Sequence, residues 1–170
     1  DADLALCERL CQSLNIPLIT EHKNLPALCK QTGEGEEECG RRLRYEFFAS
    51  IPNMDKIATA HTANDNAETL LLHLSRGTGL QGLRGILPKR GNLIRPLIAC
   101  SREQVEEFCR KQNLPFANDT TNRDTRYRRN FIRHKVLPLL EQVNPAFVES
   151  VGRCANANQK DFDYLALVGE

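Results

Sequence analysis

The chain has 170 residues, of which 41% are hydrophobic, and a formal net charge of +1. This length supports one domain, or one domain and part of another, with enough apolar residues to bury a core. There is no apolar run of 18 or more residues and no secretory signal at the acidic N-terminus, so the sequence predicts no membrane association. Seven cysteines without a CxxC pair or zinc spacing indicate free thiols and a cytoplasmic protein.

Apolar periodicity and capping signals predict helices that alternate with short strands. In chain order we expect a helix at 4–14, a strand at 16–19, an irregular segment at 20–34, a helix at 36–50, a strand at 56–60, a helix at 64–75, a glycine-rich connection at 77–91, an extended segment at 93–97, a helix at 101–112, a polar loop at 113–129, and helices at 131–141 and 145–167. This alternation favours an α/β fold with a parallel sheet.

Charge is distributed unevenly along the chain. Residues 1–55 carry 10 acidic and 6 basic side chains, a net charge of −4, whereas residues 76–135 carry 14 basic and 5 acidic ones, a net charge of +9. Residues 136–170 have a net charge of −3. A basic central zone suggests a polyanionic partner for one surface of the protein. The alternative is a mixed surface on which arginines happen to cluster.

A strand-to-helix junction carries the first candidate site. His61 ends the predicted strand, and Asp65 and Glu68 lie three positions apart in the first turns of the following helix. That spacing places both carboxylates on one helical face, near the positive end of the helix dipole. Such a pair can hold Mg²⁺, bind an ammonium group or accept its proton. The alternative is that the two carboxylates only satisfy the helix terminus.

Glycines 77, 79 and 82 match the dinucleotide fingerprint G-x-G-x-x-G. That fingerprint requires a strand before it and a helix after it. Here a predicted helix precedes it and a loop follows, so we do not expect a dinucleotide site.

A basic segment carries the second candidate site. Residues 123–135 contain six Lys and Arg side chains and one acidic one. Arg126, Arg129 and Arg133 follow a three-four spacing and could form one stripe that contacts phosphates, a salt-dependent interaction. The alternative is a solvated helix start in which arginines pair with Asp119 and Asp124.

Taken together and in order, these segments resemble the tRNA(Ile)-lysidine synthase family. The matching segments are Ala-Thr-Ala-His-x-x-x-Asp-x-x-Glu-Thr at 58–69, Arg-Gly-Thr-Gly-Leu-x-Gly-Leu at 76–83, Ile-Arg-Pro-Leu at 94–97, Asp-x-x-Asn at 119–122 and Arg-Tyr-x-Arg-Asn-x-Ile-Arg at 126–133. The resemblance covers about residues 1–145. It implies an N-type ATP pyrophosphatase (PP-loop) domain at 1–135 with a doubly wound parallel sheet, like that of adenine nucleotide α-hydrolases. Residues 136–170 would be a C-terminal helical extension, either a linker or the start of a tRNA-binding domain.

The resemblance implies ATP-dependent ligation of L-lysine to C2 of the wobble cytidine of tRNA(Ile) with a CAU anticodon, through an adenylated cytidine, with ATP and Mg²⁺ as cofactors. Two alternatives stay open. One is a PP-loop tRNA enzyme of the thiolating type, which usually brings the cysteine pairs that this chain lacks. The other is a non-catalytic RNA-binding fragment, which would explain the arginines but not the paired carboxylates.

The resemblance also implies roles for individual residues. The catalytic set is His61, Asp65 and Glu68, with the two carboxylates as Mg²⁺ ligands. Contacts to tRNA or to the adenylated intermediate are assigned to Arg126, Arg129, Asn130 and Arg133. Positions near the nucleotide are Arg76, Gly77 and Gly79. The chain departs from the family at Thr62, where a second histidine is frequent, and at Asn64, where an aspartate is frequent.

One family feature is absent from these 170 residues. The Ser-Gly-Gly-x-Asp-Ser pyrophosphate loop, with its strand and helix, would precede Asp1. Because backbone N–H groups of such a loop hold the phosphates, we expect the isolated polypeptide to be catalytically inactive. We also expect a sheet that is truncated at the N-terminus, with exposed edges that could pair with a second copy to form a homodimer.

Overall fold

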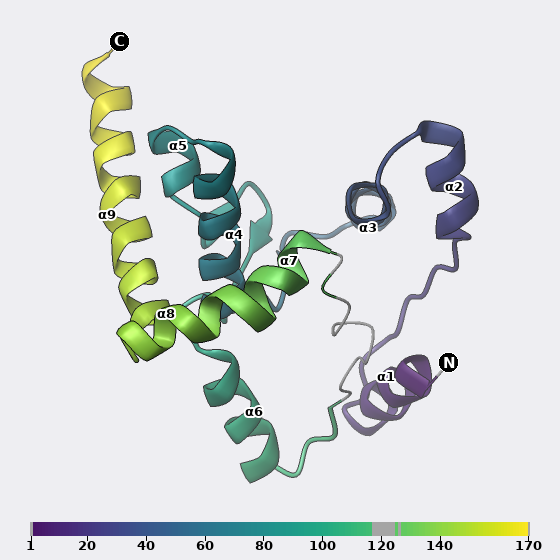
Figure 1. Cartoon of the computed structure of the whole chain (residues 1–170). Helices are drawn as coiled ribbons and strands as arrows, with labels where there is room; N and C mark the ends of the chain where they lie inside the picture. The colour runs from purple at the N-terminus through teal and green to yellow at the C-terminus, as the bar shows by residue number, and fades with distance from the viewer. Residues whose placement is uncertain (1, 117–124, 126, 170) are drawn as a thin grey trace. The chain divides into compact units, whose positions relative to one another are not determined.

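The computed structural model describes residues 2–116, 125 and 127–169 (Figure 1). It divides into two compact units, Asp1–Ile57 and Ala58–Glu170. The predicted domain boundary at residue 135 stays a prediction. All seven cysteines are free thiols. Within the described residues, every helix is too short or too polar to cross a membrane.

The first unit consists of three helices: α1 (Ala2–Ser13), α2 (Leu25–Thr32) and α3 (Glu36–Ser50). Helices α1 and α3 confirm the predictions, but α2 lies in a segment that was predicted to be irregular. The Asn24 side chain accepts a hydrogen bond from Ala27 N at 3.2 Å, and Gly33 ends the helix in the left-handed conformation. These two caps stabilise a short helix whose sequence shows little apolar periodicity.

The strand predicted at residues 16–19 is wrong, because these residues form neither helix nor strand. Ile16 and Ile19 are exposed. An apolar segment becomes a strand only where a neighbouring strand pairs with it, and the sheet of the described residues contains only β1, β2 and β3.

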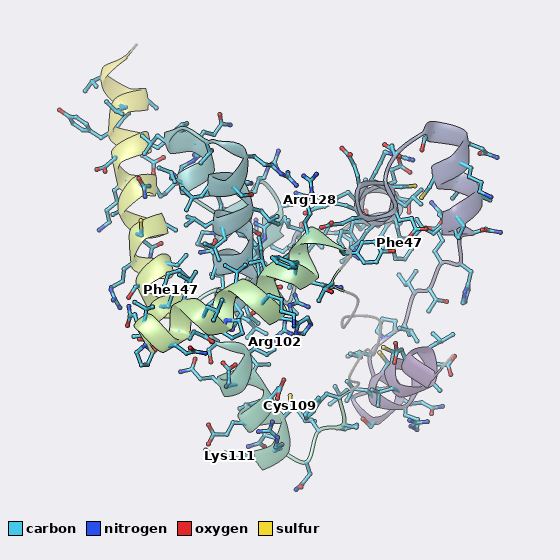
Figure 2. All side chains as sticks on the ribbon, viewed as in Figure 1. Phe47, Arg102, Cys109, Lys111, Arg128 and Phe147 are labelled. Carbon is cyan, nitrogen blue, oxygen red and sulfur yellow. The ribbon has the colours of Figure 1, made fainter. Side chains whose placement is uncertain are left out.

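The second unit contains most of the chain. Its elements are α4 (Ala63–Arg76), α5 (Leu80–Leu83), β2 (Lys89–Arg90), β3 (Leu93–Ile94), α6 (Arg102–Lys111), α7 (Arg128–Phe131), the π-helix η2 (Ile132–Val136), α8 (Leu137–Val143) and α9 (Phe147–Val168). Strand β1 (Ile57–Ala58) lies at the boundary between the units. Figure 2 labels Arg128 at the start of α7 and Phe147 at the start of α9. The predicted helices at 64–75, 101–112 and 145–167 are confirmed within one or two residues.

The sheet is much smaller than the predicted doubly wound sheet. It has three strands of two residues each in the order β1-β3-β2. Strands β2 and β3 are antiparallel, with Lys89 opposite Ile94 and Arg90 opposite Leu93. The two-residue connection is Gly91-Asn92, a dipeptide typical of tight hairpins, and Gly91 has φ +62°. A hairpin forces antiparallel pairing of β2 and β3, so the small sheet of the described residues is not wholly parallel.

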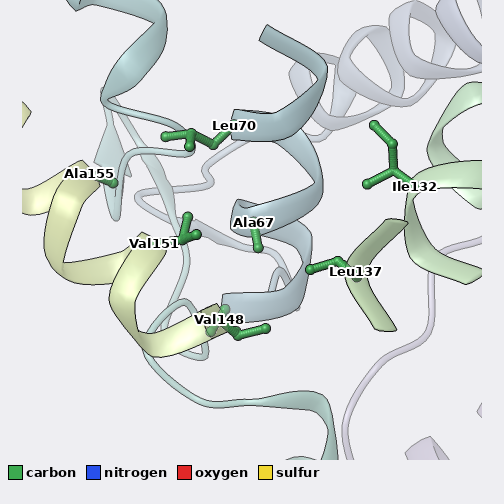
Figure 3. Packing of buried hydrophobic residues seen from close by; sticks show 8 residues of the cluster. Ala67, Leu70, Ile132, Leu137, Val148, Val151 and Ala155 are labelled. Carbon is green, nitrogen blue, oxygen red and sulfur yellow. The ribbon is translucent and has the colours of Figure 1, made fainter. Parts of the chain in front are cut away.

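The core of the second unit surrounds α4. Its buried residues are Ala63, Ala67 and Leu70 of α4, Ile132 of η2, Leu137 of α8, and Val148, Val151 and Ala155 of α9. Figure 3 shows Ala67 and Leu70 between the α9 side chains on one side and Ile132 and Leu137 on the other. Small alanines on α4 and α9 allow the helix backbones to approach closely. This packing fixes the helix that carries Asp65 and Glu68 against η2.

Residues 128–143 form one continuous helical run with a π-helical turn, where the sequence predicts a helix around Pro138. Proline has no N–H to donate to the carbonyl four residues earlier, at His134. The Leu137 N–H donates instead to Ile132 O, five residues earlier. Pro138 therefore explains why the backbone hydrogen bonds of the helix change from a spacing of four residues to five at η2. Such π-helical turns often occur at functional sites.

Candidate active site

Thr62 fixes the start of α4 and the orientation of Asp65. The backbone N–H of Thr62 donates to Asp65 Oδ2 at 2.8 Å, and the Thr62 hydroxyl donates to the same oxygen at 2.9 Å. Asp65 N donates in return to Thr62 Oγ1 at 3.5 Å, which completes a capping box. In the sequence, Thr62 stands out only as a departure from the family. The Thr-x-x-Asp spacing was the signal that could have revealed its role.

Glu68 lies one helical turn further along α4 and is fully buried, with 0% of its residue surface exposed. Its Oε1 accepts a hydrogen bond from Arg133 Nε at 2.6 Å. Its Oε2 accepts from Arg129 Nε at 2.7 Å and from Arg133 Nη2 at 2.9 Å. These are short, charge-assisted hydrogen bonds, and Arg133 binds the carboxylate in the two-pronged geometry that guanidinium favours.

Asp65 completes the group through its other oxygen. Arg129 Nη2 lies 3.1 Å from Asp65 Oδ1, and Arg133 Nη2 lies 3.5 Å from the same atom. Two carboxylates and two guanidiniums thus form one unit of zero formal charge, which we call the carboxylate–guanidinium cluster. The exposed fraction of the side chain is 16% for Asp65, 27% for Arg129 and 15% for Arg133. The two candidate sites predicted separately from the sequence are therefore one site.

The surroundings of the cluster shift two pKa values. Burial alone would raise the pKa of the Asp65 carboxyl, but the Thr62 hydrogen bonds and the charges of Arg129 and Arg102 outweigh burial and hold that pKa below its usual range. Burial alone would lower the pKa of the Arg133 guanidinium, but its hydrogen bonds to Glu68 and its attraction to both carboxylates raise it. Both shifts favour the charged forms, as expected for ion pairs.

The lowered pKa of Asp65 predicts a pH dependence of stability. A folded-state pKa below the unfolded one means that the interactions of ionised Asp65 stabilise the fold above about pH 4 and are lost as the pH falls through the folded-state pKa. We expect the difference in unfolding free energy between the wild type and Asp65→Asn to shrink below about pH 4. Urea unfolding at stepped pH values measures it. Asp161→Asn, at an exposed position on α9, is the control, and a difference that stays constant with pH would contradict the prediction.

The donor set does not fit a magnesium ion held by Asp65 and Glu68 in this arrangement. Each of the four carboxylate oxygens already accepts a hydrogen bond or ion pair from Thr62, Arg129 or Arg133. Mg²⁺ requires oxygen ligands in near-octahedral geometry and would have to displace the guanidiniums. Within residues 2–116, 125 and 127–169, no group of three or more His, Cys, Asp or Glu side chains is arranged to hold a metal.

The other predicted site residues lie at different distances from the cluster. His61 directly precedes Thr62, at the same end of α4, and its Nδ1 lies 2.9 Å from Thr59 Oγ1 in a hydrogen bond. Asn130 follows Arg129 in α7. Arg126 lies outside the described residues. The structure thus places His61, Asp65, Glu68, Arg129, Asn130 and Arg133 in neighbouring segments.

The residues predicted near the nucleotide lie at the opposite end of α4. Arg76 is eight residues beyond Glu68, about 12 Å along the helix axis. Gly77 ends α4 with φ +77°, and Gly79 precedes α5. The structure does not bring these three residues to the cluster, and their role stays a prediction.

Two asparagines outside the predicted site residues, Asn64 and Asn66, anchor α4 to its neighbours. Asn64 Oδ1 accepts a hydrogen bond from the backbone N–H of Arg102 at 2.8 Å. Asn66 is buried, and its Oδ1 accepts from Ile86 N at 2.7 Å. Position 64 needs an acceptor, so asparagine serves there in place of the frequent aspartate. These partners lie 38 and 20 residues away, beyond the reach of local pattern analysis.

Comparison with known proteins agrees with the resemblance inferred from the motifs. The chain is similar to proteins named tRNA(Ile)-lysidine synthase, with 44% identity over 147 residues in Thermosipho africanus, 42% over 154 residues in Thermotoga maritima and 42% over 167 residues in Caldanaerobacter subterraneus subsp. tengcongensis. These matches cover 85%, 89% and 96% of the chain but 34%, 37% and 36% of the relatives. The chain therefore spans about a third of the length of these curated relatives. The profile of the family described as the PP-loop domain matches residues 1–140, so the chain belongs to the PP-loop domain family.

Proposed function

We propose that the protein modifies tRNA by ligating L-lysine to C2 of the wobble cytidine of tRNA(Ile), with ATP as the activating substrate. The relatives carry the name tRNA(Ile)-lysidine synthase. The observation that carries the proposal is the carboxylate–guanidinium cluster, which joins Asp65 and Glu68 of one motif to Arg129 and Arg133 of another. These two motifs are the most chemically informative parts of the resemblance, and they meet in one partly exposed site.

The proposed reaction has two steps that balance. The C2 oxygen of cytidine attacks the α-phosphorus of ATP, and pyrophosphate leaves. The lysine ε-amine then attacks C2, the C2–O bond breaks, AMP leaves with the bonding electrons, and the amine nitrogen loses a proton. ATP would enter as its Mg²⁺ complex, because phosphate oxygens and water supply most of the ligands of such an ion.

Within this scheme the members of the cluster take different roles. Asp65 is partly exposed, and its Oδ1 has the longer ion pairs of the site, 3.1 and 3.5 Å. We assign Asp65 Oδ1 to the lysine ammonium, because exchanging a guanidinium for an ammonium conserves charge, and a carboxylate can accept the proton released on attack. Glu68 is fully buried and bonded to both arginines, so we assign it to positioning Arg129 and Arg133.

The guanidinium of Arg129 is the most exposed charged group of the cluster. Arg129 donates to Glu68 through Nε and to Asp65 through Nη2. Its Nη1 atom takes no part in these two contacts. We assign Arg129 to a phosphate of tRNA or of the adenylated intermediate, with Arg126, Asn130 and Arg133 as the predicted neighbours. His61 lies at the same end of α4 and is assigned to the same ligand. Arg76, Gly77 and Gly79 remain assigned to the nucleotide on the resemblance alone.

The test is the Asp65→Asn variant of the complete protein. Lysidine formation is measured with ATP, labelled lysine and a tRNA(Ile) transcript, and tRNA binding is measured in parallel. We expect ligation to be lost and tRNA binding to be retained. The control, Glu106→Gln, changes a surface carboxylate on α6.

Unchanged ligation by Asp65→Asn would refute the catalytic role of the cluster. Incorporation of sulfur by the wild type would instead identify a thiolating enzyme. RNA binding by the wild type without any turnover of ATP would identify a non-catalytic RNA-binding module.

A further inference from the structure

Asp65 has a cationic neighbour, Arg102, that does not belong to the carboxylate–guanidinium cluster. The cluster itself is neutral, with two carboxylates and two guanidiniums. Arg102, the first residue of α6, is a third cation whose charge acts on the Asp65 carboxyl. Adding Arg102 to the four residues of the cluster gives a formal charge of +1 for these five side chains, which favours an anion beside them.

The backbone of Arg102 is fixed beside the first turn of α4. Arg102 N donates to Asn64 Oδ1 at 2.8 Å, and Ala63 N donates to Cys100 O at 2.8 Å. The start of α6 is also closed by a capping box, in which Ser101 N donates to Gln104 Oε1 at 2.8 Å. Arg102 is therefore held next to the residue that precedes Asp65, at a position set by hydrogen bonds from both helices.

The other basic residues of α6 are used differently. Arg110 pairs with Glu106 at 2.7 Å, and Lys111 pairs with Glu107 at 2.8 Å, both as surface pairs one turn apart. Within the described part of the chain, Arg102 makes no ion pair of this kind. Figure 2 shows Arg102 and Lys111 at opposite ends of α6. Arg102 thus combines a fixed backbone with a guanidinium that has no neutralising partner on its own helix.

We propose that Arg102 binds a phosphate group and extends the ligand surface of the carboxylate–guanidinium cluster onto α6. The phosphate comes from the RNA backbone or from the nucleotide, and guanidinium suits either one, because its planar donors match two phosphate oxygens. The inference rests on the proposed function, which identifies RNA and ATP as the two ligands to test. It adds a binding residue from a helix that neither candidate site included.

The experiment compares Arg102→Ala, Arg102→Lys and the control Lys111→Ala in the complete protein. The RNA probe is a fluorescent anticodon stem-loop of tRNA(Ile), titrated by anisotropy at several salt concentrations, and the nucleotide probe is ATP, titrated by calorimetry. For an RNA phosphate, Arg102→Ala reduces the slope of log K against log salt by about 0.7–0.9 and weakens binding about tenfold. Arg102→Lys retains most of the slope, and Lys111→Ala retains all of it. For a nucleotide phosphate, ATP affinity falls instead and the RNA slope is unchanged.

If Arg102→Ala binds both probes with the same affinity and salt slope as Lys111→Ala, the inference is wrong and the proposed function is unaffected. A wild type that binds both probes but forms no lysidine would contradict the proposed function alone. The Arg102→Lys variant keeps the charge at the start of α6, so its behaviour separates loss of a phosphate contact from loss of local structure.

Discussion

Replacing Glu68 with alanine is expected to lower the unfolding free energy by about 3 kcal/mol, measured by urea unfolding of the chain. The substitution removes the only fully buried carboxylate of the cluster and leaves the guanidiniums of Arg129 and Arg133 without three short hydrogen bonds. Breaking a buried pair from one side costs about 3–5 kcal/mol, because the remaining charge stays partly desolvated. The lower end of that range applies here, because both arginines reach water.

Glu106→Ala is the matched control for Glu68→Ala. Glu106 pairs with Arg110 on the surface of α6, where both side chains are at least one-third exposed. Such a pair contributes about 0–1 kcal/mol. Glu68→Gln keeps the shape and an acceptor oxygen, so its cost should fall between the two. A cost for Glu68→Ala that equals the cost for Glu106→Ala would show that the cluster does not hold η2 against α4.

Gly85→Ala is expected to destabilise the second unit by about 3 kcal/mol, from backbone strain and from a broken hydrogen bond. Gly85 has φ +62°, where a side chain costs about 1–2 kcal/mol. A Cβ at this position would also collide with Asn66 Oδ1. That oxygen is the acceptor for the partly buried Ile86 N at 2.7 Å, and leaving such a donor unsatisfied costs about 1–3 kcal/mol.

Gly91→Ala separates these two causes. Gly91 has the same φ of +62°, but nothing lies within 4 Å of a Cβ built there. We therefore expect Gly91→Ala to cost only the backbone strain, about 1–2 kcal/mol. Equal costs for the two variants would mean that Asn66 moves aside without loss, and its anchoring role would then be wrong. Thermal unfolding of the two variants in parallel measures the difference.

Helices with strong local signals were predictable from the sequence. The 36–50 and 101–112 helices are right because their signals lie within the segment. The first has an acidic start and an end before Pro52, and the second has a Ser-x-x-Gln capping box that the structure confirms. Helix α2 was missed because its eight residues carry little periodicity, so that its capping residues were the only clear signal.

The sheet was not predictable in the same way. Residues 16–19 have strand-like composition but form no strand, and the segment around Gly91 forms an antiparallel hairpin. A strand is stabilised by hydrogen bonds to another segment, so its existence depends on which partner is present. Composition describes only one of the two partners, which is why the predicted doubly wound sheet is not seen among the described residues.

The sequence by itself determined the chemical groups of the site: two carboxylates on one helical face, and arginines at a three-four spacing far along the chain. It also determined the family, through ordered motifs. Only the tertiary structure decided that Arg129 and Arg133 pair with Asp65 and Glu68 across 61 to 68 residues. It also decided that Asn64 and Asn66 bind the backbone of segments 38 and 20 residues away. The reason is physical. Spacing along a helix follows from backbone geometry within a few residues, whereas the meeting of two distant segments follows from the packing of Ala67, Leu70 and Ile132 in a shared core.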